Sequence, residues 1–489
     1  MSNRNPEIKY KQLFINNKFV DSQSRKTFPT INPTNGKEIC KISEADKADV
    51  DLAVEAANAA FRRGSPWRTM DASARGKLLY KLADLIERDI TYLSNLETLD
   101  NGKPVGDSTF DINCAIDVFR YYAGWADKIQ GTTIPVDGSF FSYTRREPVG
   151  VVGQIIPWNY PILMVSWKWG PALAAGCTVI LKPAEQTPLT ALYLAALAQE
   201  AGFPPGVINV LPGYGPTAGA AIALHPRINK VAFTGSTEVG HLIMGNAAKS
   251  NLKRISLELG GKSPLVVCAD ANRERTSFIS IELLFYFPTM VLMICSLSID
   301  FLLYSTTELS KNSSSVKYTM YNTQVHGNNY TFFNLSREMM NKVLGLIESG
   351  KKEGAKLVTG GSRIGSVGYF VQPTVFSDVS DNMRIAKEEI FGPVQQIIKF
   401  STLEEAIERA NNTTYGLAAG ICTNDLNKAI IFSQAVQAGS VWVNCYDAVV
   451  PQAPFGGFKQ SGTGRELGED SLKEYVEVKT VTIQIPQKC

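Results

Sequence analysis

The chain has 489 residues, 44% of them hydrophobic, so it can bury substantial cores, and its length indicates about two or three domains. Its 49 basic and 46 acidic residues give a net charge of +3, which excludes a global field that would draw it to nucleic acid or anionic lipid. Eight scattered cysteines form neither a CxxC pair nor a His/Cys cluster, which argues against a disulfide framework or a metal site and predicts reduced thiols.

The predicted elements begin after a polar N-terminus. Residues 1–11 lack the apolar core of a secretory signal and the pattern of a transit peptide, so we expect a cytoplasmic protein with no membrane partner. A first amphipathic helix is predicted between Asp46 and Gly64, with apolar residues at helical spacing at Val50, Val54, Ala57 and Phe61. A second is predicted from about Ser73 to just before Asn101, with one face formed by Leu78, Leu82 and Leu85.

From Val149 onward, short apolar runs alternate with helical stretches, which is the signature of a parallel α/β sheet. The predicted strands are Val151–Ile156, Thr178–Leu181, Val207–Val210, Val231–Phe233 and Ile255–Leu257. The predicted crossover helices are Pro188–Ala201, Thr217–Leu224 and Glu238–Ala248. Ligands bind such sheets at the carboxyl ends of the strands, so the loops that follow the strands are the first candidates for chemistry.

Two further stretches are predicted to be β structure outside this sheet. Residues 132–145 are β-rich and lie between the helical and the α/β regions, where they could project as an arm. Residues 481–485 alternate apolar and polar side chains, which predicts a strand.

The loop Gly153–Pro161 follows a predicted strand and contains two prolines, a tryptophan and an amide. Asn159 could donate its amide to a developing oxyanion, and Trp158 could wall a flat ligand. A rigid strand-to-helix turn is the alternative, and the residues leave both interpretations open.

Polar residues also follow the next strands. Lys182 and Glu185 could grip ribose hydroxyls, although a solvated charge pair is the more ordinary explanation. Gly235, in the turn Phe233–Gly240, would let backbone N–H groups approach a pyrophosphate. This turn is not a GxGxxG motif, and glycine beside a Ser or Thr cap is common.

Two glutamates complete the set. Glu258 is flanked by leucines, so desolvation would raise its pKa and suit it to act as a general base on water, whereas a lone glutamate at a strand end is usually solvated. Glu389 and Phe391 stand beside a Gly-Pro turn. Glu389 could bind a ribose and Phe391 could contact a ring, but the alternative interpretation is an ordinary polar turn that the phenylalanine anchors.

In their order and separations, the five stretches described above resemble the aldehyde dehydrogenase superfamily. The combination of all five indicates this family far more specifically than any one stretch does. The similarity runs from about Gln12 to Asp270 and resumes from about Ser336 to Gln487. Three stretches look closest to the cytosolic class that oxidises retinal and other medium or long aldehydes, namely Leu346–Leu357, Tyr369–Phe376 and Val441–Tyr446.

The resemblance implies an α/β fold in three parts. A Rossmann-like NAD-binding domain would take residues 1–130 and 149–260, a second α/β catalytic domain residues 261–460, and a β oligomerisation arm residues 131–148 and 471–489. It also implies NAD as cofactor, a small-molecule aldehyde as substrate and a homo-oligomer, typically a tetramer. Neither a metal nor a nucleic acid is expected.

By matching position, Asn159 resembles the family's oxyanion donor and Glu258 its general base. Glu185 on the ribose hydroxyls would favour NAD over NADP, because a 2′-phosphate would meet a like charge. The residues that would hold the cofactor are Ile155, Pro157, Trp158, Lys182, Glu185, Gly215, Gly235, Ser236, Glu389 and Phe391. In the family mechanism a cysteine thiolate attacks the aldehyde, hydride leaves to the nicotinamide, and water activated by the glutamate hydrolyses the thioester.

Between about Ala271 and Leu335 the resemblance disappears. Cys295, the one cysteine of this segment, stands in the apolar run Met290–Ser296, which would raise the pKa of its thiol, so a buried structural thiol is favoured over a nucleophile. The segment contains one alanine and one glycine, Gly327, and its composition is typical of translated AT-rich DNA. We hypothesise that it is either a misread exon boundary or a diverged replacement, and that the family's catalytic loop is missing.

Two functions of different classes follow. The first is NAD-dependent oxidation of an aldehyde to a carboxylic acid. The second is a catalytically dead family member, or a mis-predicted gene product, that keeps the NAD-binding scaffold without the cysteine loop. Asn159, Glu185 and Glu258 favour the enzyme, because a purely structural protein has no evident use for them. A third function, ester hydrolysis through Glu258, would also need a thiol.

Overall fold

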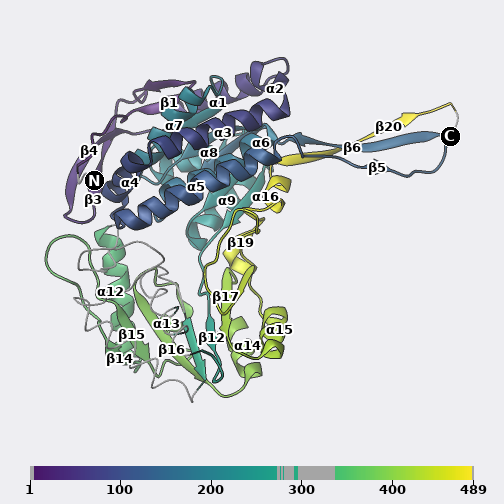
Figure 1. The fold of residues 1–489 in the computed structure, drawn as a ribbon. Coiled ribbons are helices and arrows are strands. Elements are labelled where there is room, and N and C mark those ends of the chain that lie inside the picture. Colours follow the sequence, from purple (N-terminus) through teal and green to yellow (C-terminus); the bar gives the residue numbers. More distant parts are fainter. Residues whose placement is uncertain (1–4, 273–275, 277–278, 280–290, 296–335, 487–489) are drawn as a thin grey trace.

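The computed structural model describes residues 5–272, 276, 279, 291–295 and 336–486. It consists of two α/β bodies, one built largely from the N-terminal half and one from the C-terminal half, and a long β arm (Figure 1). The expected fold class is confirmed, with a mostly parallel sheet in each body.

The first body is organised by an eight-stranded sheet in the order β19-β11-β10-β7-β8-β9-β1-β2. The five strands from β11 to β9 run parallel. Every residue of β7, β8 and β10 is buried, which is why apolar residues stand side by side in these strands rather than alternating with polar ones. The bounds are β1 Leu13–Ile15, β2 Lys18–Val20, β7 Val151–Ile155, β8 Thr178–Lys182, β9 Ile208–Val210, β10 Lys230–Thr234, β11 Arg254–Glu258 and β19 Gly462–Thr463.

Helices pack around this sheet. Helix α1 begins with a capping box at Asp46, whose carboxylate accepts from Ala48 N at 2.9 Å, as the amphipathic pattern predicted. The helices are α1 Lys47–Phe61, α2 Pro66–Thr69, α3 Ala72–Arg88, α4 Ile90–Asn101, α5 Val105–Trp125, α6 Pro161–Ala175, α7 Leu189–Ala201, α8 Ala220–Leu224 and α9 Thr237–Lys249. A π-helical turn, Gly215–Gly219, precedes α8, and a hairpin of β3 (Thr27–Asn32) and β4 (Lys37–Ser43) lies outside the sheet.

One predicted helix was wrong in its extent. The helix expected from Ser73 to Asn101 is two helices, α3 and α4, separated at Asp89, whose carboxylate accepts from Arg88 and from the Tyr193 hydroxyl at 2.9 Å. One local contact and one contact with a distant helix therefore meet at Asp89, where α3 ends and α4 begins. Of the predicted leucines, Leu82 is buried, whereas Leu78 and Leu85 are replaced on the buried face of α3 by their neighbours Leu79 and Ile86.

The second body contains a seven-stranded sheet in the order β14-β15-β16-β13-β12-β17-β18. Its strands are β12 Leu265–Val267, β13 Val291–Cys295, β14 Lys356–Thr359, β15 Thr374–Ser377, β16 Val394–Phe400, β17 Ala418–Cys422 and β18 Ser440–Val443. Its helices are α12 Arg337–Lys352, α13 Arg384–Lys387, α14 Leu403–Asn411 and α15 Leu426–Ala435. The 3₁₀ turn Lys459–Ser461 and α16 Asp470–Lys473 follow β18 in the chain.

The segment that departs from the family contributes one strand to this sheet. The backbone of β13 runs parallel to β12 and to β16, with Cys295 opposite Phe400 at its end. The Cys295 side chain and most of the segment 271–335 lie outside the described residues, so the predicted burial of this thiol stays a prediction.

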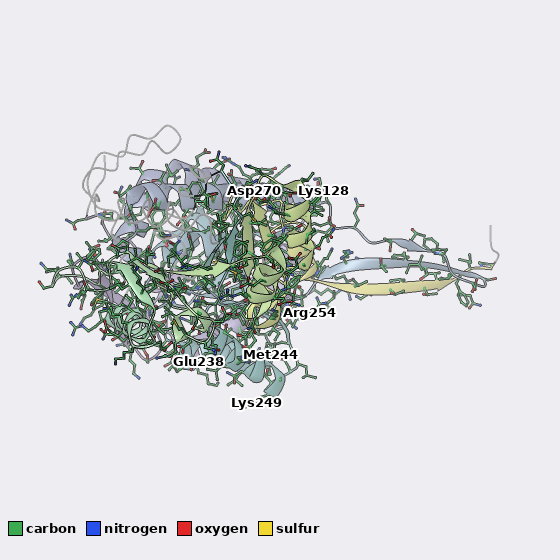
Figure 2. All side chains as sticks on the ribbon, turned by 90° about the horizontal axis from the view of Figure 1, so that it is seen from below. Lys128, Glu238, Met244, Lys249, Arg254 and Asp270 are labelled. Carbon is green, nitrogen blue, oxygen red and sulfur yellow. The ribbon has the colours of Figure 1, made fainter. Side chains whose placement is uncertain are left out.

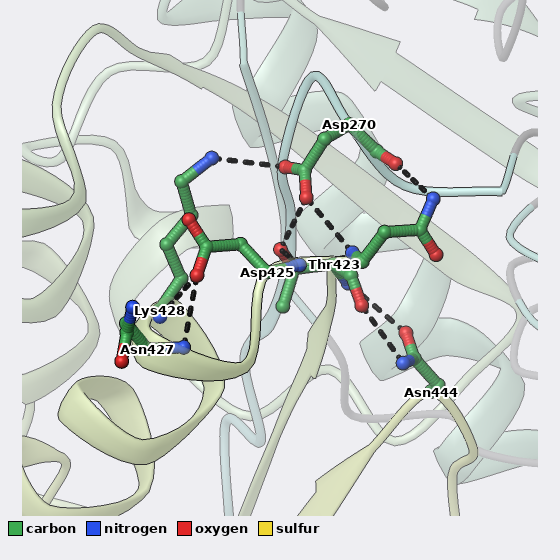
Figure 3. A network of polar contacts seen from close by, with 7 residues as sticks. Asp270, Thr423, Asp425, Asn427, Lys428 and Asn444 are labelled. Atoms are coloured by element: carbon green, nitrogen blue, oxygen red, sulfur yellow. Dashed lines mark hydrogen bonds and ion pairs between the residues drawn. The ribbon is translucent and has the colours of Figure 1, made fainter.

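A polar network fixes the chain just before that segment (Figure 3). Asp270 follows β12 and accepts hydrogen bonds from the Thr423 hydroxyl at 2.7 Å and from Asn424 N at 2.8 Å, and it pairs with Lys428 at 3.0 Å. Asn444 in turn bonds the backbone of Thr423 on both sides. These contacts therefore link the end of β12 to the end of β17.

The arm consists of β5 (Thr133–Ile134), β6 (Phe140–Pro148) and β20 (Val476–Gln484), in the order β20-β6-β5. The predicted arm and the predicted C-terminal strand thus pair with each other, antiparallel, and project from the first body (Figure 1). Figure 2 shows the arm leaving the body on the side where Lys128 and Arg254 lie. Arg254 of β11 donates to Val476 O at 2.6 Å and so anchors the root of β20.

Within the described residues, no helix is long and apolar enough to cross a membrane. The same residues contain no group of three or more His, Cys, Asp or Glu side chains arranged to hold a metal ion. The six cysteines whose side chains are described form no disulfide.

Candidate active site

The carboxyl ends of the central strands bring the predicted site residues to one edge of the first sheet. Ile155 ends β7 and lies opposite Lys182, the last residue of β8, and opposite Phe233 of β10. Glu258 ends β11 and lies opposite Thr234. Because neighbouring strands are about 4.8 Å apart, the loop that carries Asn159 starts only about 10 Å from Glu258, across β10.

Asn159 lies in the loop between β7 and α6 and offers an uncommitted amide. Its Oδ1 is buried without a hydrogen-bond partner, and no described residue accepts a hydrogen bond from its Nδ2. The neighbouring backbone is held, since Asn101 Nδ2 donates to Trp158 O at 2.6 Å. A half-buried amide that has no partner among the described residues and stands beside a fixed backbone suits a donor to a reacting oxygen.

Glu258 belongs to a buried cluster that the sequence did not reveal. Its Oε2 accepts from the Thr234 hydroxyl at 3.4 Å, and Thr234 Oγ1 accepts from Lys168 Nζ at 2.7 Å. Lys168 is fully buried on α6 and forms an ion pair with Glu466. Burial, and then the charge of Glu466, raise the pKa of Glu258 to about 8, while Lys168 lowers it. A carboxyl poised near neutral pH is suited to take a proton from water.

Sequence reasoning missed Lys168 and Glu466, although a signal was present for one of them. Lys168 is the single charged residue of the otherwise apolar helix α6, and a lysine in such a place needs a buried partner. That partner arrives from the C-terminal region, where β19 pairs antiparallel with β11 and sets Gly462 opposite Glu258. No local pattern links Glu466 to a lysine so far back in the chain.

Lys182 and Glu185 lie together after β8. Lys182 Nζ donates to Pro183 O and to Gly213 O, both at 2.8 Å, and lies 3.4 Å from Glu185 Oε2. Burial lowers the pKa of Lys182 while Glu185 opposes the shift. The Glu185 carboxylate keeps 30% of its surface accessible, so it can reach a ligand. Nearby, a Cβ at Gly215 would meet nothing within 4 Å, which leaves open space at the start of the π-helical turn.

Gly235 and Ser236 lie at the turn from β10 into α9. Gly235 donates its N–H to Glu258 O at 3.0 Å, so this N–H is already engaged. The glycine is required locally, because a Cβ there would lie 2.5 Å from the ring of Phe233. Ser236 caps α9 by accepting from Val239 N at 3.3 Å. The hydroxyl hydrogen of Ser236 and the start of α9 are therefore the groups at this turn that suit a phosphate.

The second body reaches the same edge through Glu389 and Phe391. The ring of Phe391 packs edge-on against Trp158, with the ring centroids 5.3 Å apart, so two aromatic residues predicted from distant stretches do meet. Glu389 Oε1 accepts from Gly261 N at 3.1 Å, and burial raises the pKa of Glu389. A Cβ at Gly260 would lie 2.3 Å from Glu389 Oε2, which accounts for a glycine there.

A surface cavity of about 830 Å³ lies elsewhere, beside α1 and α2. It is lined by Phe61, Arg62, Arg63, Arg68, Arg227 and their neighbours, and by none of the predicted site residues. The candidate active site therefore rests on the geometry of the strand ends and of the buried cluster around Glu258.

Comparison with known proteins gives a consistent result. Residues 19–288 and 330–481 match the aldehyde dehydrogenase family. The break between the matched stretches lies inside the segment 271–335 and is narrower than predicted.

Aldehyde dehydrogenase 1A1 of Oryctolagus cuniculus is 59% identical over 99% of this chain and 98% of that protein. The mitochondrial aldehyde dehydrogenase of Sus scrofa is 57% identical over 99% and 94% of the two chains. The NAD⁺ complex structure of the aldehyde dehydrogenase from Bacillus cereus is similar with a TM-score of 0.92 and 46% identity, covering 98% of this chain and 97% of that one.

Proposed function

This chain belongs to the aldehyde dehydrogenase family and is an NAD-dependent oxidoreductase, and we propose that it oxidises its aldehyde at the sheet edge between Asn159 and Glu258. The observation that carries this placement is the cluster of Glu258, Thr234, Lys168 and Glu466, which raises the pKa of Glu258 to about 8 at the end of a strand. The alternative of a non-catalytic scaffold is not favoured, because the chain matches enzymes of this family along nearly its whole length.

The described residues fit NAD. We propose that the Glu185 carboxylate binds the ribose hydroxyls, that the open space at Gly215 admits the dinucleotide, and that Trp158 and Phe391 wall the nicotinamide end. The further residues proposed to contact it are Ile155, Pro157, Lys182, Gly235, Ser236 and Glu389. When bound, NAD supplies the acceptor for the hydride of the aldehyde.

The protein's own groups then do two things. The amide of Asn159, which has no partner among the described residues, donates a hydrogen bond to the oxygen of the aldehyde as negative charge develops there. Glu258 takes a proton from the water that releases the acid, and Lys168, reached through the Thr234 hydroxyl, stabilises the charged carboxylate while Glu466 opposes it.

The nucleophile expected for the family is a cysteine thiolate. Cys295 is the one cysteine between residues 271 and 335, and its side chain lies outside the described residues, so its role stays a hypothesis. Peptide mass spectrometry of the native protein decides whether this segment is real. Recovery of peptides that span Glu282 to Lys311 would overturn the idea of a misread exon boundary.

We propose the following division of labour between the parts of the chain. Residues 1–130 and 149–260 hold NAD, residues 261–460 complete the catalytic domain, and the arm mediates assembly of a homotetramer. The arm exposes large apolar side chains at Phe140, Phe141, Val478 and Ile483, which supports a role in association. A cytoplasmic location and retinal or another medium or long aldehyde as substrate are also proposed, on the resemblance of the sequence to that class.

The proposal is tested by aldehyde-dependent NADH formation with purified full-length protein. Glu258→Gln should lower steady-state turnover by about 100-fold or more and leave NAD binding intact, because it removes only the base. Glu404→Gln, an exposed glutamate on α14, is the matched control and should turn over like the wild type. A folded, NAD-binding wild type without turnover would refute the proposal.

A further inference from the structure

We propose that three buried polar residues in the last turn of α4, Glu97, Asp100 and Asn101, position the two ligand-binding loops of the active site. We call them the α4 clamp. They grip the loop that carries Asn159 and the loop that carries Glu185 through backbone groups. This inference rests on the proposed function, because it assigns these side chains a purpose in catalysis beyond packing.

The clamp fixes the backbone immediately before Asn159. Asn101 is 2% exposed, and its Nδ2 donates to Trp158 O at 2.6 Å while its Oδ1 accepts from Lys103 N at 3.2 Å. Both ends of this amide are therefore engaged and its orientation is set. Because Trp158 O belongs to the peptide bond that leads into Asn159, a turn of this peptide would re-aim the Asn159 side chain.

The clamp also fixes the backbone after Asn159. Glu97 is fully buried, and its Oε1 accepts from Ile162 N at 3.2 Å, in the first turn of α6. Between these two points, the Lys103 ammonium lies 4.2 Å from the centre of the Tyr160 ring. The loop is thus held on both sides of Asn159 and left free at the Asn159 amide itself.

The third member of the clamp, Asp100, holds the loop that carries Glu185. Asp100 is fully buried, and its Oδ2 accepts from Leu189 N at 2.9 Å at the start of α7, while its Oδ1 accepts from the Thr30 hydroxyl at 2.8 Å. This contact closes the segment between Lys182 and α7, which contains Glu185. One helical turn therefore sets the positions of two loops that follow neighbouring strands, β7 and β8.

The chemistry of the clamp argues for more than packing. Burial raises the pKa of Glu97 to about 7 and that of Asp100 to about 8, against the lowering effects of their partners. Buried carboxyls are costly, and apolar residues would fill the same space without that cost. Polar groups are needed here because the atoms they hold are backbone N–H and C=O groups of loops, which apolar side chains cannot bind.

Two variants of the clamp should affect different kinetic constants. Asn101→Asp keeps the shape and the acceptor of the side chain but replaces the donor to Trp158 O with an oxygen, so kcat should fall by about 10- to 100-fold with the KM for NAD nearly unchanged. Asp100→Ala removes the contact to Leu189 N, so the KM for NAD should rise by about 3- to 10-fold with a smaller effect on kcat.

Two matched variants control for general damage. Asn95→Asp changes a buried asparagine of the same helix whose Nδ2 donates to Thr91 O within that helix, at 2.6 Å. Asp49→Ala removes another buried aspartate, which belongs to the capping box of α1, accepts from Asp46 N and Gln23 N, and is far in sequence from both loops. Neither control should reproduce the split between kcat and KM.

Hydrogen–deuterium exchange tests the clamp without any need for turnover. Asn101→Asp should speed exchange in peptides that cover residues 158–165, and Asp100→Ala in peptides that cover residues 184–192, each without affecting the other loop. Equal changes in the controls, or no change in either loop, would overturn the inference. A wild type that binds NAD but lacks turnover would instead refute the proposed function, and the exchange pattern would still decide the clamp.

Discussion

The sharpest prediction concerns the cluster around Glu258, where two substitutions should move the same pKa in opposite directions. Glu466→Gln removes the negative charge that raises the pKa of Glu258 and leaves Lys168 unneutralised, so both effects lower the pKa from about 8. Lys168→Met removes the positive charge that lowers it, so the pKa should rise. Glu258 acts as a base only when it is deprotonated, so the alkaline rise in turnover should shift with its pKa.

The structure gives the size of the shift. The two hydrogen bonds through Thr234 Oγ1, at 3.4 Å and 2.7 Å, put Lys168 Nζ within about 6 Å of Glu258 Oε2. At an effective dielectric constant of about 20, a charge at that distance is worth about 3 kcal/mol, or about two pKa units. We therefore expect displacements of about one to two pH units, downward for Glu466→Gln and upward for Lys168→Met.

The assay is the pH dependence of kcat at saturating NAD and aldehyde, with circular dichroism at each pH to confirm that the variants stay folded. Folding must be checked because Lys168→Met leaves Glu466 buried without its partner. If the two variants shifted the profile in the same direction, or not at all, the reasoning about Glu258 as the base would be refuted.

Two further predictions follow from contacts outside this cluster. Glu185→Gln should reduce the preference for NAD over NADP by about 10-fold, measured as the ratio of the two kcat/KM values. The substitution removes the negative charge that a 2′-phosphate would meet, and it leaves the positive charge of Lys182 at 3.4 Å from the same position. Asp270→Ala should lower the free energy of unfolding by about 1–2 kcal/mol at pH 7, measured by urea titration. Burial alone would raise the pKa of Asp270, but the hydrogen bonds from Thr423, Lys428 and Asn424 lower it to about 2, so the charged carboxylate stabilises the folded state. That stabilisation is present above the unfolded pKa of 3.8 and is lost as the pH falls toward 2, so an equal loss at pH 7 and near pH 2 would contradict it.

Much of the fold was predictable because burial leaves a clear pattern in the sequence. Strands β7, β8 and β10 are buried throughout, and each contains consecutive apolar residues, with polar residues only at Gln154 in β7 and at the ends of β8 and β10. The Asp46 cap marks the start of α1 for the same kind of local reason. The break between α3 and α4 was not predictable, since it depends on Asp89 meeting Tyr193 of a distant helix.

The site was predictable only where its residues follow strands. Asn159, Glu185 and Glu258 stand at strand ends, and the sheet order brings them to one edge. Lys168, Glu466 and the α4 clamp act through contacts between segments far apart in the sequence, and the polar residues of the clamp look like an ordinary helix end. The nucleophile expected for the family would lie in the segment 271–335, where the sequence departs from the family and most residues lie outside those described.

Pre-steady-state NADH formation by Glu258→Gln tests the central claim most directly. If Glu258 serves the water that releases the acid, mixing this variant with NAD and aldehyde should give a burst of up to about one NADH per subunit, followed by nearly no turnover, while the wild type continues. A variant that continues at the wild-type rate after the burst would show that the base is elsewhere and would contradict the account.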